Sequence, residues 1–240
     1  MKIIKYFAII ILGCYLSFVG EQNALKFPHL PKVPKSSELN PRVISATIIG
    51  AMFFGGFRGI IVNLVWMYID NLWHQGRFYK LPSLYEIVTT IQPQYIDGWV
   101  MGGWHMAYNM SLELPNVKNI SIQLRKKIEL DWVYRGIDFL KAGSELNPKN
   151  AKIYFEIGWT YYHRLKDYQS SIKWFELSAK QKDGLNVTSR LVAFAYEKSG
   201  NISMAYKKWL ELKSDNQYNN QTSKNIIDRN IKRLNEMMEK

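Results

Sequence analysis

The sequence contains one cysteine, Cys14, and four histidines in 240 residues. A single thiol cannot close a disulfide within the chain, and it cannot build a zinc site of several cysteines. No two histidines stand at metal-ligand spacing on one helix. We therefore expect no metal ion and no cofactor.

The sequence patterns of common enzyme sites are also missing. There is no Walker phosphate loop, no dinucleotide-binding glycine pattern and no Gly-x-Ser-x-Gly elbow. Asp97, Glu129 and Asp131 are carboxylates of the kind that acid–base catalysis uses, but no pattern pairs them with a pocket. We expect a protein that is not an enzyme, with no catalytic residues and no small-molecule substrate.

Long blocks of one charge are absent, although the net charge is +12. The 32 Lys and Arg residues are spread along the chain, and the densest cluster, residues 125–127, is followed at once by Glu129 and Asp131. A nucleic-acid-binding domain usually concentrates its positive charge on one face. The charge therefore predicts a lysine-rich surface, part of it near a membrane, and no nucleic-acid partner.

The N-terminal segment, residues 1–20, has the pattern of a signal anchor or a signal peptide. The basic stretch Met1–Lys5 precedes the uncharged, mostly apolar run Tyr6–Val19. Residues 11–14 resemble a bacterial lipobox, in which Cys14 would be lipidated. The apolar run continues past Cys14 and a small-x-small cleavage site is poor, which favours an uncleaved anchor over a lipoprotein or a cleaved leader.

Residues 21–42 follow as a linker, because four prolines forbid a continuous helix: Pro28, Pro31, Pro34 and Pro41. Next comes an apolar stretch, residues 43–57, whose 15 uncharged residues fall short of the roughly 20 that a spanning helix needs. We expect a helix that lies against the membrane or packs on the domain that follows. The rival is a second span over residues 43–66, which would place Arg58 and Asn63 at membrane depth.

The two alternatives differ in topology. If Lys2 and Lys5 are cytoplasmic, a single span in a bacterial inner membrane places the C-terminal domain on the periplasmic side. A second span over residues 43–66 would return that domain to the cytoplasm.

From Phe57 onward, apolar residues recur with the period of helices that bury one face. Two helical patterns close alike, at Ile91–Pro93 and Leu146–Pro148. Helix–helix turns are expected at three further points: Gly76, Asp167 and Gly200. The arrangement resembles the tetratricopeptide repeat (TPR), a 34-residue helix-turn-helix unit that stacks on its neighbours. The resemblance implies an all-α, TPR-like solenoid of about three to four repeats over residues 58–221.

The repeat register has three notable features. Gly103 and Gly158 fall where the two helices of a repeat approach closely, but the third repeat fits only with one extra residue before Ser171. The second repeat carries an insertion at about residues 113–127, either a functional loop or a solvent-exposed elaboration. Residues 222–240 predict a C-terminal capping helix with one apolar and one basic face.

A closer resemblance covers residues from about 45 to 165. It rests on several short motifs: Phe57-Arg58-Gly59, Trp66, Gly76-Arg77-Phe78-Tyr79, Ile91-Gln92-Pro93, Trp99 and Ala107-Tyr108-Asn109-Met110-Ser111. These motifs are similar to those of a group of bacterial membrane-anchored TPR proteins. The resemblance implies a fold and a membrane location far more than a mechanism.

In TPR folds the first helix of each repeat lines a concave surface, and the resemblance implies an aromatic groove here. Its candidate residues are Asn63, Trp66, Asp70, Trp73, His74, Trp104, Tyr108, Phe155, Trp159, Tyr162, His163 and Phe194. Trp and Tyr offer a large contact area at low entropic cost, as in binding hot spots. The groove would bind a protein or peptide, or be filled by the chain's own proline linker or residues 43–57.

These features suggest a membrane-anchored scaffold for protein–protein interaction, one that helps to assemble a bacterial envelope complex. The alternative is a structural subunit that is permanently packed in a larger membrane assembly.

Overall fold

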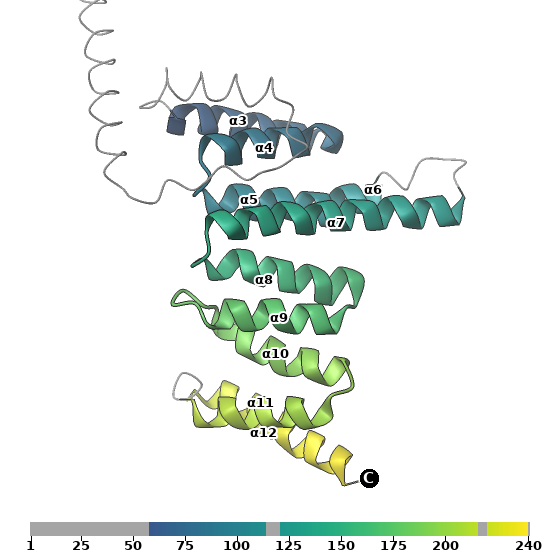
Figure 1. Cartoon of the computed structure of the whole chain (residues 1–240), viewed down its shortest axis with the longest axis vertical. Coiled ribbons are helices and arrows are strands. Elements are labelled where there is room, and N and C mark those ends of the chain that lie inside the picture. Colours follow the sequence, from purple (N-terminus) through teal and green to yellow (C-terminus); the bar gives the residue numbers. More distant parts are fainter. Residues whose placement is uncertain (1–57, 114–120, 216–219, 240) are drawn as a thin grey trace, which may run out of the picture. The chain divides into compact units, whose positions relative to one another are not determined.

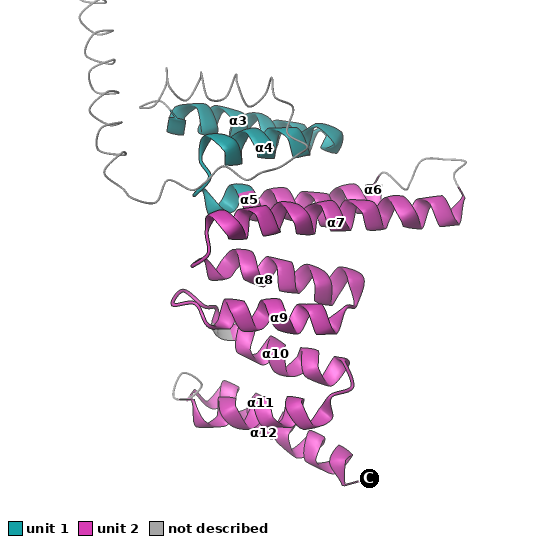
Figure 2. Ribbon diagram, viewed as in Figure 1, with its two compact units in different colours: residues 1–98 teal, residues 99–240 magenta. Residues whose placement is uncertain are grey.

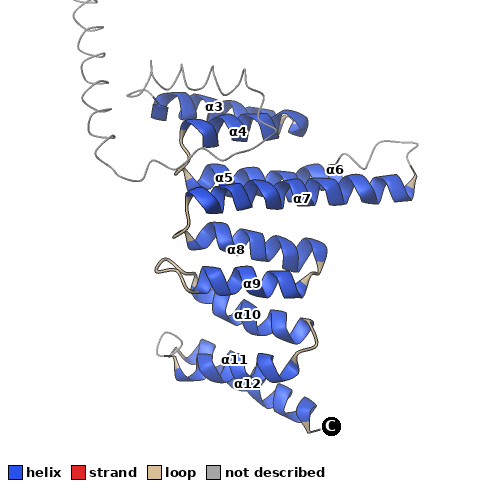
Figure 3. Cartoon of the chain, in the orientation of Figure 1, coloured by secondary structure: helices blue, strands red, loops and turns tan. Residues whose placement is uncertain are grey.

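The computed structural model describes residues 58–113, 121–215 and 220–239. Cys14, the linker 21–42 and the apolar stretch 43–57 lie outside the described residues, as does the middle of the expected insertion. Within the described ranges every regular element is a helix and no strand occurs (Figure 3). The all-α prediction is confirmed for this part of the chain. None of the helices described is long and apolar enough to cross a membrane.

The chain divides into two compact units, residues 1–98 and 99–240 (Figure 2). The described part of unit 1 contains helix α3 (Arg58–His74), the 3₁₀ turn η2 (Phe78–Lys80) and helix α4 (Leu81–Ile91). Helices α3 and α4 pack on each other. They bury six large side chains in unit 1: Val62, Ile69, Leu72, Leu81, Tyr85 and Val88.

Unit 2 begins within α5 (Ile96–Trp104), which continues through the π-helical turn η3 (His105–Met110) into α6 (Ser111–Glu113). Next come α7 (Ile122–Leu146), α8 (Ala151–Thr160), the π-helical turn η5 (Tyr161–Leu165) and α9 (Tyr168–Ala179). Helices α10 (Asn186–Lys198), α11 (Ile202–Ser214) and α12 (Gln221–Met238) complete the unit. Each helix packs on the next one along the chain, which is solenoid-like packing (Figure 1).

Five helices of unit 2, namely α7, α8, α9, α11 and α12, start at residues whose side chains cap them. The side chains of Ser121, Asn150, Asp167, Asn201 and Asn220 each accept a hydrogen bond from the backbone N–H three residues on, at 2.9–3.2 Å. Such a cap typically stabilises a helix by about 1 kcal/mol. Ser121 explains why α7 begins at Ile122, earlier than the expected second helix of this repeat, which started at Ile128.

The expected helix–helix turns are present in both units. Gly76 and Gly200 have positive φ angles, +68° and +84°, a conformation that costs glycine little. The N–H group after each glycine, of Arg77 and of Asn201, donates back five residues, to Leu72 and to Tyr196. At the third turn the left-handed residue is Lys166, one place before the expected Asp167.

Glycines let the helices of unit 2 approach closely. A Cβ atom on Gly158 of α8 would lie 2.7 Å from the ring of Phe175 on α9. A Cβ atom on Gly136 of α7 would lie 2.6 Å from the backbone oxygen of Gly103 on α5. Both approaches are shorter than any real Cβ contact, so these pairs of helices can pack this closely only around glycine.

We expect Gly158→Ala to destabilise unit 2 by about 1–3 kcal/mol, because Phe175 has no room to move within a close-packed core. Thermal unfolding of the full chain, followed by circular dichroism, measures the effect. Gly59→Ala is the control, since a Cβ atom there would meet only the far end of Gln92, at 3.8 Å. The alanine should be neutral or slightly stabilising in the first turn of α3. Equal effects of the two substitutions would contradict the close approach.

Candidate functional site

Five of the predicted groove residues form one row of stacked rings in unit 2. Trp104 stacks on Tyr108 at 5.9 Å between ring centroids, and Tyr108 stacks on His163, also at 5.9 Å. His163 stacks on Trp159 at 5.4 Å, and Trp159 stacks on Phe155 at 6.3 Å. The aromatic row therefore joins α5 and η3 to α8 and η5 without a break.

The rings of the aromatic row lie nearly parallel to one another and are partly open to the solvent. The angles between neighbouring ring planes are only 5–26°. His163 is exposed, and Trp104, Tyr108, Phe155 and Trp159 are half-buried. Ring edges carry partial positive charge and the indole and imidazole N–H groups are donors. Chemically, the row offers apolar area with donors, which suits a ligand rich in backbone carbonyl groups.

Tyr162, the sixth predicted residue of this region, lies beside the row. Its ring is 6.0 Å from Trp159 and 6.2 Å from Phe175 of the core. Phe194 does not join the row, because it packs edge-on against Trp209 at 5.0 Å, in the core that α10, α11 and α12 share. Phe194 is half-buried, as four of the five rings of the row are, and it lies apart from the row.

Two π-helical turns position the middle of the aromatic row. Tyr108 lies in η3, and His163 lies in η5. A π-helical turn accommodates one more residue than an α-helical turn, so the extra residue that the third repeat needs before Ser171 is taken up in η5. Turns of this kind occur frequently at functional sites.

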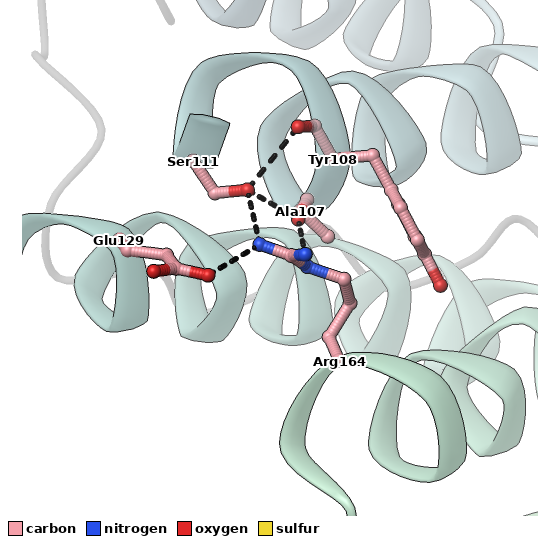
Figure 4. A network of polar contacts seen from close by, with 5 residues as sticks. All are labelled: Ala107, Tyr108, Ser111, Glu129 and Arg164. Atoms are coloured by element: carbon pink, nitrogen blue, oxygen red, sulfur yellow. Dashed lines mark hydrogen bonds and ion pairs between the residues drawn. The ribbon is translucent and has the colours of Figure 1, made fainter. Parts of the chain in front are cut away.

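Arg164 connects the two π-helical turns (Figure 4). Its Nε donates to the backbone oxygen of Ala107 at 3.0 Å, and one terminal nitrogen donates to Ser111 Oγ at 3.0 Å. The same nitrogen lies 2.8 Å from a carboxylate oxygen of Glu129 on α7. The guanidinium also lies 5.5 Å from the ring centroid of Tyr108. One side chain thus joins η5 to η3, α6 and α7.

The network gives Glu129 a structural role. Sequence reasoning noted this carboxylate only as a conceivable acid–base group, and it did not single out Arg164 at all. In the structure Glu129 is the ion-pair partner of a guanidinium that is 13% exposed. The only sequence signal was an arginine directly after the predicted groove residues Tyr162 and His163.

The phenol of Tyr108 is held neutral by its surroundings. Burial raises the pKa of Tyr108 to about 12, and the charge of nearby Glu156 adds to the shift, while Thr160 and Arg164 oppose it. Burial also raises the pKa of the Glu156 carboxyl, against the influence of Lys152. A weakly hydrated acidic group thus lies next to the aromatic row and would attract a basic or donor group on a ligand.

His105 is buried beneath the aromatic row, 5.1 Å from the ring of Trp104. The amide of Asn109 donates to its Nδ1 at 2.9 Å. Burial lowers the pKa of His105 to about 4, so the ring is neutral at pH 7. This histidine supports the packing of η3 and does not contact the solvent.

The other predicted groove residues belong to unit 1. Trp66 is packed inside that unit, edge-on against Tyr85 and Tyr95 at 5.8 and 5.4 Å. Asn63, Asp70, Trp73 and His74 are exposed on α3. His74 Nδ1 lies 2.8 Å from the backbone oxygen of Asp70, and Trp73 meets the His74 ring edge-on at 4.9 Å.

Unit 2 also has a cleft of about 320 Å³ between α9, α10 and α11, outside the predicted set. Lys208 lines it and lies 3.0 Å from Glu211 and 3.9 Å from Glu176. Burial lowers the pKa of Lys208, but Glu211 and Glu176 raise it by more. Lys208 is thus paired within the cleft by Glu211 and Glu176, which is typical of a structural ion-pair cluster. Among the described residues no group of three His, Cys, Asp or Glu is placed to hold a metal ion.

Comparisons with protein-family models, with curated proteins and with solved structures found no match to this chain.

We expect Arg164→Met to destabilise unit 2 by roughly 2–4 kcal/mol, because it removes charge-assisted hydrogen bonds and leaves Glu129 without its partner. Arg164→Lys should recover little, since an ammonium cannot reproduce the planar fork that reaches three acceptors. Chemical unfolding of the full chain gives the values. Arg229→Met on the exposed side of α12 is the control and should stay within about 0.5 kcal/mol. Full recovery by lysine would contradict the fork geometry.

His105 predicts a pH dependence of stability. Its pKa is about 4 in the folded chain and 6.5 in the unfolded chain, so unfolding takes up a proton between these values. Above pH 6.5 the ring is neutral in both states, so the pH does not affect the free energy of unfolding through His105. As the pH falls towards 4, protonation of the unfolded chain alone lowers the free energy of unfolding by up to about 3 kcal/mol. Comparison of unfolding at several pH values for the native chain and His105→Gln isolates the effect. Parallel pH profiles of the two proteins would refute it.

Proposed function

We propose that this chain is a TPR-like scaffold that binds a protein or peptide through the aromatic row. The TPR assignment is supported by close helix contacts at the repeat positions where such contacts are expected. Gly103 and Gly158, the predicted close-approach residues, each face a large side chain of the next long helix, Leu140 and Phe175. Ser171, on the partner side of this contact, is fully buried. No repeat of this kind buries its apolar face alone, so stacking is required.

The observation that carries the binding function is the aromatic row itself. Five rings stack in sequence across two helical segments, yet four of them are only half-buried and His163 is exposed. Aromatic side chains held rigid and open to solvent lose little entropy on binding, which is why they dominate interfaces. The Arg164 network adds rigidity, because it ties together the turns that carry Tyr108 and His163.

Membrane attachment is the second part of the proposal, and it rests on sequence. The basic residues Lys2 and Lys5 and the apolar run Tyr6–Val19 are typical of a signal anchor in a bacterial inner membrane. An anchored scaffold of this kind would assemble an envelope complex on the periplasmic side. Residues 43–66 as a second span would place it on the cytoplasmic side instead.

A second candidate function is a subunit that is permanently packed in a membrane assembly. The exposed face of α3 favours it, because Ile60, Leu64 and Met67 are 55%, 61% and 69% exposed. A contiguous apolar patch on a soluble protein commonly marks an interface. This candidate predicts that domain 58–240 alone aggregates, whereas a scaffold with an open row remains a soluble monomer.

We expect Trp104→Ala and Trp159→Ala to reduce recovery of the partner by at least tenfold when the full chain is purified from detergent-solubilised membranes. Each substitution removes one ring of the row, and hot-spot aromatics contribute about 2 kcal/mol or more. Quantitative mass spectrometry of the co-purified proteins measures the loss.

Trp132→Ala is the matched control, since Trp132 is a half-buried tryptophan on α7 whose ring lies 4.9 Å from Arg135, outside the row. It should leave recovery of the partner unchanged. Partners that are indifferent to both substitutions in the row would exclude the row as the binding surface. Partners lost equally with Trp132→Ala would indicate general unfolding.

A further inference from the structure

A carboxylate without a partner lies beside the aromatic row. Glu156 of α8 stands in sequence between two residues of the row, Phe155 and Trp159, and its side chain is half-buried. Among the described residues, no donor and no cation forms a hydrogen bond or an ion pair with this carboxylate. Lys152, one helical turn earlier, acts on it only through its charge. Removing a carboxylate from water costs free energy unless a partner replaces the water.

The other half-buried glutamates of unit 2 show that this is unusual within the described chain. Three more glutamates of the unit are half-buried, and each lies 2.6–3.9 Å from a cation. The pairs are Glu129 with Arg164, Glu176 with Lys208, and Glu197 with Arg233. Glu156 has the same burial and lacks the cation, so we infer that its partner comes from outside the chain.

Glu156 lies on the flank of α8 that faces η3. It is three residues from Trp159, which places the two side chains about 60° apart around the helix. Burial raises the pKa of the Tyr108 phenol on η3, and the charge of Glu156 raises it further, while Thr160 lowers it. The carboxylate is therefore near Tyr108, at the point where the row passes from η5 to η3 through the stack of His163 on Tyr108.

The rings beside Glu156 are able to accept a cation. Neighbouring centroids in the row are 5.4–6.3 Å apart, a separation typical of offset stacking, in which part of each ring face stays uncovered. Cations are attracted to the faces of Trp and Tyr rings. The chain already places one there, since the guanidinium of Arg164 lies 5.5 Å from the ring centroid of Tyr108. Arg164 is paired with Glu129, so it does not neutralise Glu156.

We propose that the aromatic row recognises a lysine or arginine side chain of its partner, with Glu156 as the counter-ion and Tyr108 and Trp159 as the rings that the side chain contacts. This inference rests on the proposed binding function of the row, and it adds the chemistry of the ligand, a basic segment of a protein or peptide. Charge complementarity of this kind contributes mainly to the choice of partner.

The net charge of the chain makes this inference specific. Because the whole chain carries +12, its general field repels basic peptides and favours acidic ones. A preference for basic peptides therefore has to come from a local negative group that is placed at the binding surface.

Defined peptides test the inference with the full chain in micelles of an uncharged detergent. An array of 12-residue peptides without cysteine is probed with fluorescently labelled protein. The peptide that binds best is then titrated by fluorescence anisotropy, together with versions in which each Lys or Arg is replaced by Gln. We expect one basic residue whose replacement weakens binding at least tenfold. With Glu156→Gln the same replacement should change the affinity less than twofold, because the counter-ion is missing.

Glu236→Gln, on the exposed side of α12, is the matched control. It changes the net charge of the chain equally and should leave the tenfold effect intact. Glu156→Asp keeps a carboxylate and should retain part of the effect. The melting temperature of Glu156→Gln should be unchanged or higher, because a half-buried charge without a partner is removed. A lower melting temperature would show that the carboxylate stabilises the chain itself, and would contradict the inference.

Two further results would overturn the inference and leave the proposed function in place. One is a best-binding peptide that contains neither Lys nor Arg, and the other is a tenfold effect that persists with Glu156→Gln. In both cases Trp159→Ala would still abolish binding of the peptides. If peptides bind the Trp159→Ala chain as well as the native chain, the row is not the binding surface, and both proposals fail.

Discussion

The close approach of backbones at glycine is the constraint on which unit 2 depends. Where α7 meets α5, the backbone oxygen of Gly103 occupies the place that a Cβ atom on Gly136 would need. Gly158 makes the same room for the ring of Phe175. Because the helices approach this closely, the side chains next to the glycines cannot fill the space between them and are placed at the margin. Trp104 and Trp159 stand at such positions, one residue beyond Gly103 and Gly158.

The aromatic row follows from that placement and from two local departures from α-helical geometry. In η3 and η5 the backbone takes up an additional residue, and the residues that follow are rotated relative to an unbroken α-helix. Tyr108 of η3 and His163 of η5 stack on each other, and Arg164 of η5 reaches Ala107 of η3 and Ser111 of α6. The row and the network beneath it are therefore two results of the same pair of turns.

The helical fold and the residues of the aromatic row could be predicted from the sequence. The features that could not be predicted have physical reasons. The resemblance to the TPR put Phe155, Trp159 and His163 at groove positions that share one helix face by their i, i+4 spacing. The turns were predicted at Gly76, Asp167 and Gly200. The role of Arg164 could not be read from sequence, because its acceptors Ala107 and Ser111 lie more than 50 residues away along the chain. Phe194 has the same expected repeat position as Trp104 and Trp159 and is half-buried as they are, but its ring meets Trp209 of α11 edge-on and does not join the row. The spacing of residues along one helix determines which of them share a face, but the neighbouring helix determines what that face contacts.

The polar outer side of α12 has a consequence for assembly. Arg233 of this helix forms a bidentate salt bridge with Glu197 of α10, at 2.6 and 2.7 Å, and this contact holds α12 against α10. The exposed side chains of α12 carry both signs of charge, with Lys224, Arg229 and Lys232 beside Asp228 and Glu236. Head-to-tail growth of such stacks into a filament needs an apolar end to meet a complementary end. The exposed side of α12 is mostly polar, so it offers little apolar area for such a contact.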